Sequence, residues 1–369
     1  MRRAFTKFLG ISTCLTFIIS CSSEEPAGPR DSSADSTSSV IEPSPDPQKL
    51  VLFMSPTGND SNSGLVWDKP VATFDRVQDI LFSRMPESDV EIHLHHGTYK
   101  SQSITQWTFV NGKKIIFTPI NFSKERPIFD GEGRQYWFRL EAGSGTNTNL
   151  YFRYIKVMNY KNGVYLSGDR ENEGGGWNGN NHFYGMYFLN IGSKHAGGEN
   201  YGLAAIGMIN SRNNVVTNCH FVNLENRDNN GDGSAEDECS HLHAVYMAHY
   251  SSNNRISWNR IERVCGDPIK VRDESNWNDV RHNRFIRTGQ NAFYVDAPCT
   301  RPLCQGEDDE KCCTKSTIEC PSYGNEFRDN DCNKGYSGGK ISLFRYIAPD
   351  DRCGPLPERR LRTSGNVNY

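Results

Sequence analysis

The 369-residue sequence lacks the short motifs of several large enzyme classes. It has no GxSxG nucleophile elbow, no phosphate-binding P-loop and no glycine-rich dinucleotide fingerprint. It also lacks a CxxC pair, which weakens any interpretation of its cysteines as zinc ligands. With 41 Lys and Arg against 44 Asp and Glu, the chain is close to neutral and contains no basic block. A nucleic-acid partner is therefore not expected.

A long hydrophobic run is missing too. The apolar stretch at residues 8–20 follows a positively charged start and is short for a membrane span. It ends in Ile-Ile-Ser-Cys21, which resembles a bacterial lipobox, so Cys21 is the expected site of lipidation. An ordinary secretory signal and an uncleaved anchor are the alternatives. Ser22 and Ser23 are not the acidic residues typical of inner-membrane lipoproteins, which favours the outer membrane or the cell surface.

Large apolar residues are scarce between the signal and the folded region. Residues 22–48 are rich in Ser, Pro and Asp and cannot offset their ordering entropy by burial. The sequence thus predicts a signal peptide at 1–20, a disordered tether at 21–49 and one folded domain at 50–369. A monomer is expected.

The folded region contains a repeat of 24 residues. Val245-Tyr-Met, Ile269-Lys-Val and Phe293-Tyr-Val follow one another at this spacing. Between them, the pattern apolar-x-x-Asn-x-apolar occurs at residues 256–261 and again at 280–285. Short alternating strands cannot bury their apolar face alone, so the copies must stack. The sequence predicts an all-β protein, a right-handed parallel β-helix with a disulfide-rich C-terminal part.

Related copies of the pattern begin at Phe152, Phe183, Val216 and Phe327. With the copies at residues 256 and 280 included, the intervals between successive starts are 31, 33, 40, 24 and 47 residues. The intervals longer than 24 residues indicate coils with insertions, and the interval of 47 residues indicates either one coil or two. Asparagines near each copy are expected at turns with positive φ. These are Asn149, Asn181, Asn214, Asn254, Asn278 and Asn325.

The N-terminal part of the domain resembles a known group of proteins. Residues 55–64 (SPTGNDSNSG), 69–74 (KPVATF) and 96–99 (HGTY) are similar to the opening of extracellular β-helix proteins of the pectate-lyase-like superfamily. Residues 71–82 have the pattern of an amphipathic helix that caps the open end of the solenoid. The superfamily includes lyases, hydrolases and non-enzymatic surface proteins, so the resemblance implies a fold more than an activity.

Alternation along the strands predicts one exposed face. If Val245, Ile269 and Phe293 point inward, their neighbours point outward. The first outward column is then Tyr246, Lys270 and Tyr294, and the second is Ala248, Arg272 and Asp296. Just past the strand ends lie His249, Tyr250, Asp273 and Glu274.

A face of this composition suits an acidic polysaccharide. Cations can neutralise a uronate carboxylate, and tyrosines offer both a stacking surface and a proton. Asp273, Asp296 and, from an inserted loop, Trp177 are expected to contact the substrate. The alternative is that the charged residues form solvated ion pairs between coils, each of little energetic consequence.

Residues 266–272 (GDPIKVR) and the following Asn276 resemble the chondroitinase B and alginate lyase family. That family carries an Arg at the end of such a strand, and Arg272 occupies this place. Its catalytic Lys lies one coil earlier, where this sequence has His249 or Tyr250 instead. The resemblance implies β-elimination: Arg272, Lys270 or Ca²⁺ neutralises the uronate, His249 or Tyr250 removes the proton, and Tyr246 or Tyr294 protonates the leaving oxygen.

An acidic insertion precedes this face. Its oxygen-bearing residues and glycines match the first half of an EF-hand calcium loop, although the twelfth position holds Cys239. The expected ligands of Ca²⁺ are Asp228, Asn230, Asp232, Glu236 and Glu238. A Ca²⁺ ion here could bind a uronate and acidify the proton to be removed. A solvated acidic loop is the alternative.

Ten cysteines remain after Cys14 and Cys21 are set aside. An even number in an exported chain predicts up to five disulfides. Zinc at His241, His243 and Cys239 is the weaker interpretation, because alternation turns His243 inward and Cys239 is expected in a disulfide.

These observations predict a surface-anchored protein that binds and cleaves an acidic polysaccharide. A non-catalytic β-helix for adhesion or glycan binding is the first alternative. A glycoside hydrolase is the second; it needs paired carboxylates, for which Asp273 and Asp296 are only loosely suited.

Overall fold

The computed structural model describes residues 49–369, except 101, 103–104, 142–143, 197–201, 228–237 and 300–317. The expected signal peptide and tether lie outside the described residues. Residues 47–369 form one compact unit. Within the described part of the chain, no helix is long and apolar enough to cross a membrane.

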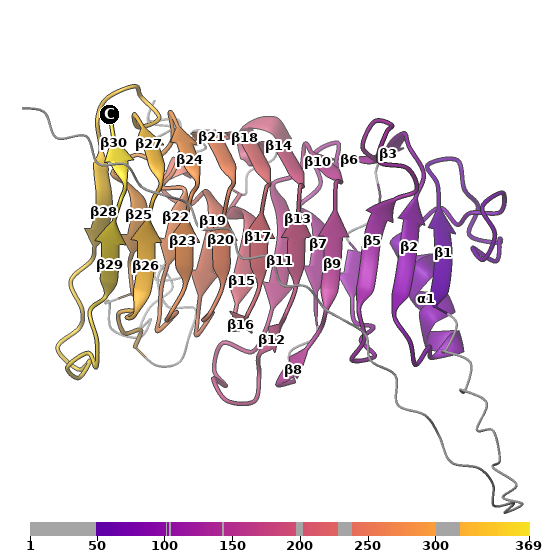
Figure 1. The fold of residues 1–369 in the computed structure, drawn as a ribbon, viewed down its shortest axis with the longest axis horizontal. Helices are drawn as coiled ribbons and strands as arrows, with labels where there is room; N and C mark the ends of the chain where they lie inside the picture. The colour runs from indigo at the N-terminus through magenta and orange to yellow at the C-terminus, as the bar shows by residue number, and fades with distance from the viewer. Residues whose placement is uncertain are drawn as a thin grey trace, which may run out of the picture. The chain divides into compact units, whose positions relative to one another are not determined.

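Three long sheets make up the domain (Figure 1). Sheet A contains β1 (Leu50–Met54), β2 (Val90–Leu94), β5 (Ile115–Pro119), β9 (Leu150–Arg153), β13 (His182–Tyr184), β17 (Val215–Thr217), β20 (Arg255–Ser257), β23 (Asp279–Arg281), β26 (Asn325–Arg328) and β29 (Leu361–Ser364). Sheet B contains β3 (Thr98–Lys100), β6 (Ile128–Asp130), β10 (Lys156–Met158), β14 (Tyr187–Ile191), β18 (His220–Leu224), β21 (Arg260–Val264), β24 (Arg284–Ile286), β27 (Asp331–Asn333) and β30 (Val367–Asn368).

Sheet C contains β4 (Thr105–Trp107), β7 (Tyr136–Leu140), β11 (Asn162–Ser167), β15 (Ala204–Ile209), β19 (His243–Ala248), β22 (Ile269–Val271), β25 (Ala292–Asp296) and β28 (Ser342–Tyr346). A short sheet D joins β8 (Thr146–Asn147), β12 (Asn178–Gly179) and β16 (Ser211–Arg212). The helices are α1 (Phe74–Arg84) and α2 (Ser193–Ala196).

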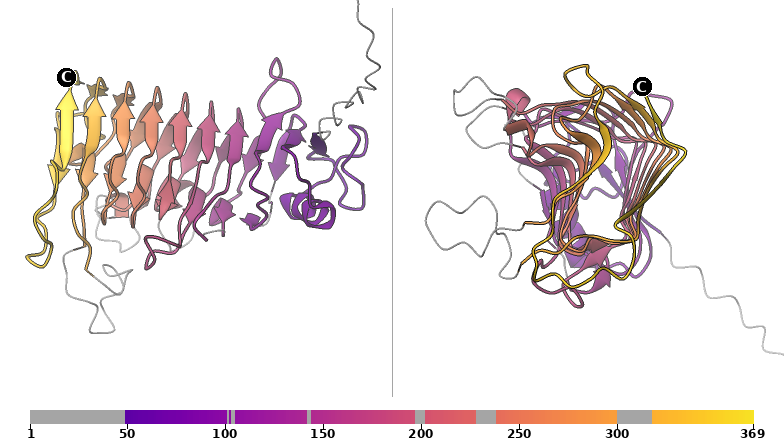
Figure 2. Two further views of the ribbon diagram at one scale, coloured as in Figure 1. Left: turned by 60° about the horizontal axis from the view of Figure 1, so that its bottom comes forward. Right: turned by 90° about the vertical axis from the view of Figure 1, so that its left-hand side faces the viewer.

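Each complete coil gives one strand to sheet A, one to sheet B and one to sheet C, and the strands pair in parallel with their counterparts in the adjacent coils. Seen along the stacking direction, the strands of successive coils superpose around a shared interior (Figure 2). The predicted right-handed parallel β-helix is therefore confirmed.

The pairing of strands confirms most of the predicted repeat. Val216, Ile256 and Val280 lie in register on β17, β20 and β23. Phe327 on β26 pairs directly with Val280, so the interval of 47 residues is a single coil with an insertion and not two coils.

Aromatic side chains stack through the interior from coil to coil. The rings of Phe117 and Phe152 are 4.6 Å apart and nearly parallel, and the ring of Phe183 follows 5.2 Å further on. All three side chains are fully buried. Because identical positions of successive coils face one another, like residues stack on like, and the repeat gains its stability between coils.

Helix α1 caps the N-terminal end of this interior, as its amphipathic pattern predicts (Figure 1). Thr73 is the N-cap and accepts a hydrogen bond from the backbone N–H of Arg76. The ring of Phe74, at the start of α1, packs against Phe117 and Phe129, so the helix closes the apolar stack against water.

The asparagines expected at positive φ have a different role. Of the six, only Asn149 has a positive φ; for the others the left-handed residue is the one before, such as Asn253 or Trp277. Their amides form a buried ladder instead, in which Asn254 Nδ2 donates to Asn278 Oδ1 at 3.0 Å. The other side-chain rungs are Asn181–Asn214 and Asn214–Asn254, and the backbone N–H of Asn278 donates to Asn325 Oδ1. A second ladder joins Asn259, Asn283, Asn330 and Asn366.

We predict that Asn278→Ala lowers the free energy of unfolding by about 3 kcal/mol, because buried groups of its own turn and of the turn in the preceding coil lose their hydrogen-bond partner. Asn278 Oδ1 accepts from the backbone N–H and the side chain of Asn254, and its Nδ2 donates to the carbonyls of Ser251 and Ser275. Urea unfolding measures the change. Asn291→Ala, on an exposed side chain, is the control; equal losses in both variants would contradict the ladder's role.

Candidate functional site

The candidate site lies on the outer face of sheet C. Strand register aligns Tyr165 of β11 with Gly207, Gly207 with Tyr246 of β19, and Tyr246 with Lys270 of β22. The first outward column predicted from the sequence is therefore confirmed for Tyr246 and Lys270.

The column does not continue to Tyr294. Lys270 pairs with Val295, whereas Tyr294 pairs with Ile269 and packs against Phe327 in the core. The coil between β22 and β25 is one residue longer than the 24-residue repeat, so alternation counted from Phe293 assigned the wrong side. The expected exposure of Tyr294 is wrong.

Asp296 is likewise turned inward and is only 1% exposed. Its carboxylate accepts a 2.9 Å hydrogen bond from Arg360 Nε. Burial raises the pKa of Asp296 to about 6, although Arg360 and Ser322 oppose the shift. Asp296 thus anchors the C-terminal coil and does not reach a ligand on sheet C.

Three polar side chains form the centre of the face. Lys270 Nζ lies 6.0 Å from the centre of the Tyr246 ring, and Arg272 Nη1 donates to Tyr246 Oη at 3.3 Å. The guanidinium of Arg272 also donates to both oxygens of Glu319, which is almost completely buried. Glu319 accepts a third hydrogen bond from the backbone N–H of Cys299. Two parallel hydrogen bonds to one carboxylate hold the planar guanidinium in a single orientation.

His243 belongs to this group, contrary to the inward orientation expected from alternation. Its ring stacks on Tyr246 at 5.6 Å, and its Nδ1 donates to the carbonyl of Asp267 at 2.6 Å. Burial, together with the nearby Lys270, keeps the pKa of His243 well below its ordinary value. The imidazole is therefore neutral near pH 7, with Nε2 as a hydrogen-bond acceptor.

A small pocket opens between these residues. It has a volume of about 50 Å³ and is lined by Leu203, His241, His243, Tyr246, Lys270 and Arg272. That volume accommodates one or two water molecules, or a carboxylate group, but not a sugar ring. A sugar must therefore lie over the face and insert only a substituent.

Lys270 has an unusual protonation equilibrium. Burial, and then the charge of Arg272, lower its pKa to about 8, and the carboxylates of Asp267 and Glu319 only partly oppose this. Near neutral pH a measurable fraction of the amine is unprotonated and can accept a proton.

Tyrosines and arginines extend the face toward the N-terminus. The guanidinium of Arg139, on β7, lies 5.9 Å from the ring of Tyr136 and 5.8 Å from that of Tyr165. Arg139 and Lys270 lie on the first and last of five neighbouring strands, a span of four strand spacings or about 19 Å. The face is thus long enough to contact several sugar residues.

His249 and Asp273 lie beside this face but are buried. His249 Nδ1 and Asp273 Oδ2 are 2.8 Å apart, and the two side chains are 1% and 0% exposed. His249, Tyr250, Asp273 and Glu274 all have positive φ, which costs each residue about 1–3 kcal/mol. Neither His249 as a base nor Asp273 as a substrate contact is accessible as expected. Tyr250 follows His249 and is partly exposed.

Among the described residues one group could hold a metal ion. Ligand atoms of His249, Asp273 and Glu319 all lie within 4.8 Å of one another. Because Arg272 donates to both oxygens of Glu319, a cation there meets a competing positive charge. Of the expected calcium ligands, Asp228, Asn230, Asp232 and Glu236 lie outside the described residues, and only Glu238 is described.

The disulfide prediction is confirmed in part. Cys239 bonds to Cys265, and Cys320 bonds to Cys353, so Cys239 is not a zinc ligand. Cys219 and Cys332 are unpaired thiols in the core, and burial raises the pKa of Cys219 to about 12. Cys304, Cys312 and Cys313 lie outside the described residues.

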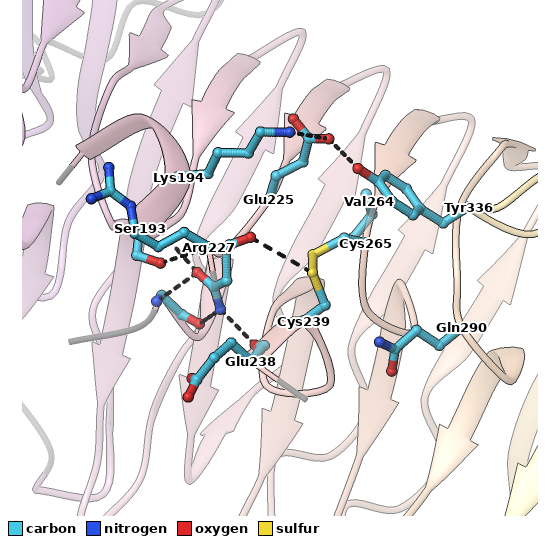
Figure 3. The surroundings of a disulfide bond; sticks show 12 residues. Ser193, Lys194, Glu225, Arg227, Glu238, Cys239, Val264, Cys265, Gln290 and Tyr336 are labelled. Carbon is cyan, nitrogen blue, oxygen red and sulfur yellow. Dashed lines mark hydrogen bonds and ion pairs between the residues drawn. A yellow bond between two sulfur atoms is a disulfide. The ribbon is translucent and has the colours of Figure 1, made fainter. Parts of the chain in front are cut away.

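Figure 3 shows a charged cluster next to the Cys239–Cys265 bond. Lys194 and Tyr336 both point toward the buried carboxylate of Glu225, which also contacts His195 and Arg263. Burial alone would raise the pKa of Glu225, but the hydrogen bonds from His195, Tyr336 and Lys194 lower it to about 2. This fully paired cluster stabilises the turn after sheet B.

Trp177 is not part of the site on sheet C. Its carbonyl accepts a hydrogen bond from Gly145, and it precedes β12 of sheet D, where it is half-buried. Its expected contact with a substrate at Lys270 therefore has no geometric support.

Sequence reasoning missed Glu319 and His243. Glu319 follows Arg272 by 47 residues, the interval that also separates Val280 from Phe327, so it occupies the corresponding place in the next coil. The outward orientation of His243 could have been found from the sequence. The next two residues, Ala244 and Val245, are small or apolar, and both lie in the core. Two successive inward residues reverse the alternation before them.

Comparison with known proteins identifies no family for this chain. No family model and no curated protein match the sequence. Among solved structures, the chain is similar to the pectate lyase Pel9A (14% identity, TM-score 0.47, 82% of this chain and 62% of that one). It is also similar to an alginate lyase from Paenibacillus sp. str. FPU-7 (12% identity, TM-score 0.48, 87% of this chain and 99% of that one). A third similar structure is a GH136 lacto-N-biosidase from Eubacterium ramulus (10% identity, TM-score 0.39, 86% of this chain and 67% of that one). The chain thus spans less than two thirds of the pectate lyase.

We predict that Lys270 reacts with acetic anhydride with a pH midpoint near 8, measured by mass spectrometry of the peptide that contains it. In the denatured chain the same lysine should have a midpoint of about 10.4. Arg272→Gln should raise the folded midpoint, because it removes a positive neighbour and releases the negative charge of Glu319. A folded midpoint equal to the denatured one would contradict this environment.

Proposed function

We propose that the outer face of sheet C binds an acidic, uronate-containing polysaccharide and cleaves it by β-elimination. The observation that carries the proposal is Lys270, an amine with a lowered pKa that shares a carboxylate-sized pocket with Arg272 and contacts Tyr246. Cation, base and proton donor, the three groups that this reaction needs, meet at one point of the face.

Arg272 is the proposed partner of the uronate carboxylate. Its guanidinium stays charged at every relevant pH, and its two hydrogen bonds to Glu319 fix the orientation. Pairing a carboxylate with a cation withdraws charge from the adjacent carbon and makes its C5 proton more acidic. Arg272 therefore supports charge that develops in the transition state.

Lys270 is the proposed base, in place of His249. The imidazole of His249 is buried against Asp273, whereas Lys270 lines the pocket. The neutral amine takes the C5 proton, the C4–O bond breaks, and a C4=C5 double bond forms. The departing oxygen takes the hydroxyl proton of Tyr246, whose pKa is raised by burial, so that the phenol stays protonated.

A non-catalytic glycan-binding role is the alternative that a specific observation favours. Glu319 already neutralises Arg272, and a face of paired charges and tyrosines can hold a sugar chain without cleaving it. Hydrolysis has less support, because Asp273 and Asp296 are both buried and engaged by His249 and Arg360.

We predict that the purified protein releases unsaturated products from at least one polymer in a panel of polygalacturonate, alginate and hyaluronan, measured by their ultraviolet absorbance. Lys270→Met should lower kcat at least about 100-fold, the contribution of a general base. The rate should rise as pH increases through about 8, because only the unprotonated amine can accept the proton.

Lys161→Met, on a buried lysine outside the pocket, is the control for loss of a lysine. A parallel assay with a chelator tests whether activity depends on the Ca²⁺ ion expected from the acidic insertion. Absence of product from every polymer, with binding retained, would establish the non-catalytic role instead. Full activity in Lys270→Met would refute the assignment of the base alone.

We also propose that Cys21, outside the described residues, carries a lipid that anchors the protein to the outer membrane or cell surface. In a bacterial host the wild-type chain should fractionate with membranes, and Cys21→Ser should lose this association. Cys14→Ser is the matched control and should stay membrane-bound. Equal fractionation of all three chains would exclude the anchor.

A further inference from the structure

The outer face of sheet A carries an aromatic groove that the site on sheet C does not use. Two adjoining pockets, of about 370 and 480 Å³, share Phe122 and Tyr154 in their walls. The other aromatic residues that line the first pocket are Tyr151, Phe152, His182, Phe183 and Tyr184. Together they are many times larger than the pocket at Lys270.

The aromatic side chains are arranged by the spacing of the coils. Tyr151 and His182 are paired residues on β9 and β13, and their rings stack at 4.3 Å. Tyr154 meets Tyr184 edge-on at 5.2 Å, and it meets Phe122 at 5.1 Å. Phe122 and Tyr184 are 59% and 39% exposed, so the groove presents ring faces and edges to solvent.

A loop after β5 forms one wall. Phe122 projects from this loop, and Arg126, near its end, donates to the carbonyl of Gly185 across the turn. The guanidinium of Arg126 also lies 5.3 Å from the centre of the Tyr154 ring. These contacts join the loop to the adjacent coils, so the groove is preformed.

Four cations surround the groove: Lys114, Lys124, Arg126 and Arg153. Within the described part of the chain none of them forms an ion pair with a carboxylate. Burial and the charges of Lys114 and Arg153 lower the pKa of the adjacent His182, which agrees with a positive local potential. The groove thus combines exposed rings with four cations that outnumber the one carboxylate of its loop, Glu125.

The same face looks different three coils further along. There Asp279 forms ion pairs with Arg255, Arg281 and Arg328, and Glu326 pairs with Arg328. Paired charges of this kind are typical of a solvated β-helix surface. The unpaired cations at the aromatic groove are therefore a local feature and not the general character of sheet A.

We propose that this groove is a second glycan-binding site, which holds a segment of an acidic polysaccharide away from sheet C. Sugar rings offer C–H faces to the aromatic side chains, and their carboxylate or sulfate groups complement the four cations. Binding here requires no cleavage, so the site stands even where the proposed lyase activity fails. A groove for a neutral glycan or a second copy of the chain does not account for the unpaired cations.

The test is the affinity of the purified protein for oligosaccharides of polygalacturonate, alginate and hyaluronan, with maltooligosaccharides as uncharged probes. At least one acidic oligosaccharide should bind, and its Kd should rise with ionic strength because exposed charges are screened. Phe122→Ala combined with Tyr184→Ala should weaken binding about tenfold, equal to about 1.4 kcal/mol. Arg153→Gln should weaken it and flatten the salt dependence. The variants are made in an Arg272→Gln background, which removes the proposed carboxylate partner on sheet C and so separates this site from that one.

Trp258→Ala is the matched control. Trp258 is 61% exposed, stacks on His282 at 4.3 Å and occupies the turn position that Tyr154 has three coils earlier. The Trp258→Ala variant should bind like the wild type, and circular dichroism should show that all variants are folded. Equal loss in Trp258→Ala, equal binding of maltooligosaccharides, unchanged Kd in the double variant, or no binding by any acidic probe would each overturn the proposal. So would a double variant that changes only self-association in light scattering, since the groove is then an interface between copies.

Discussion

The alignment of one coil on the next is the constraint on which the rest of this structure depends. Parallel strands pair residue by residue along three sheets, and buried asparagine ladders hold the turns before sheet A and between sheets A and B in the same register. A slip of one residue would turn every side chain of a strand to the opposite side of the sheet. Because the ladder amides fit only when each coil lies directly over the previous one, backbone pairing and amide pairing specify the same register.

That constraint determines which residues can meet at the candidate site. Tyr246 and Lys270 are neighbours because β19 and β22 are in register, and Tyr294 is excluded because the next coil is one residue longer. Arg272 gains its partner in the same way, because Glu319 lies 47 residues later, the interval that also separates Val280 from Phe327, and occupies the corresponding place in the next coil. The stacked coils thus supply both the surface and the group that orients Arg272.

The sequence was therefore sufficient for the fold and for part of the site. The repeat at Val245 and Ile269 gave the coil, the strands and the outward direction of Lys270, since both copies have the same length. The repeat assigned the wrong side chains to the outer face at Phe293-Tyr294-Val295, because three apolar or aromatic residues in a row fit either orientation of the strand. It also failed at the asparagines, whose place next to a turn is the same whether they adopt positive φ or hydrogen-bond between coils. Glu319 was missed because the interval of 47 residues was left open between one coil and two; a single coil places Glu319 next to Arg272.

The two faces differ in how their positive charge is handled, and this difference has consequences for binding. On sheet C, Arg272 is neutralised by Glu319, so the titration of Lys270 sets the net charge of Arg272, Glu319 and Lys270 together. Below the pKa of Lys270 these three side chains attract an anion, but no base is present. Above that pKa the base is present, but the attraction for an anion is weaker. The groove on sheet A lies apart from Lys270, so a chain held there stays close to sheet C in both states of Lys270.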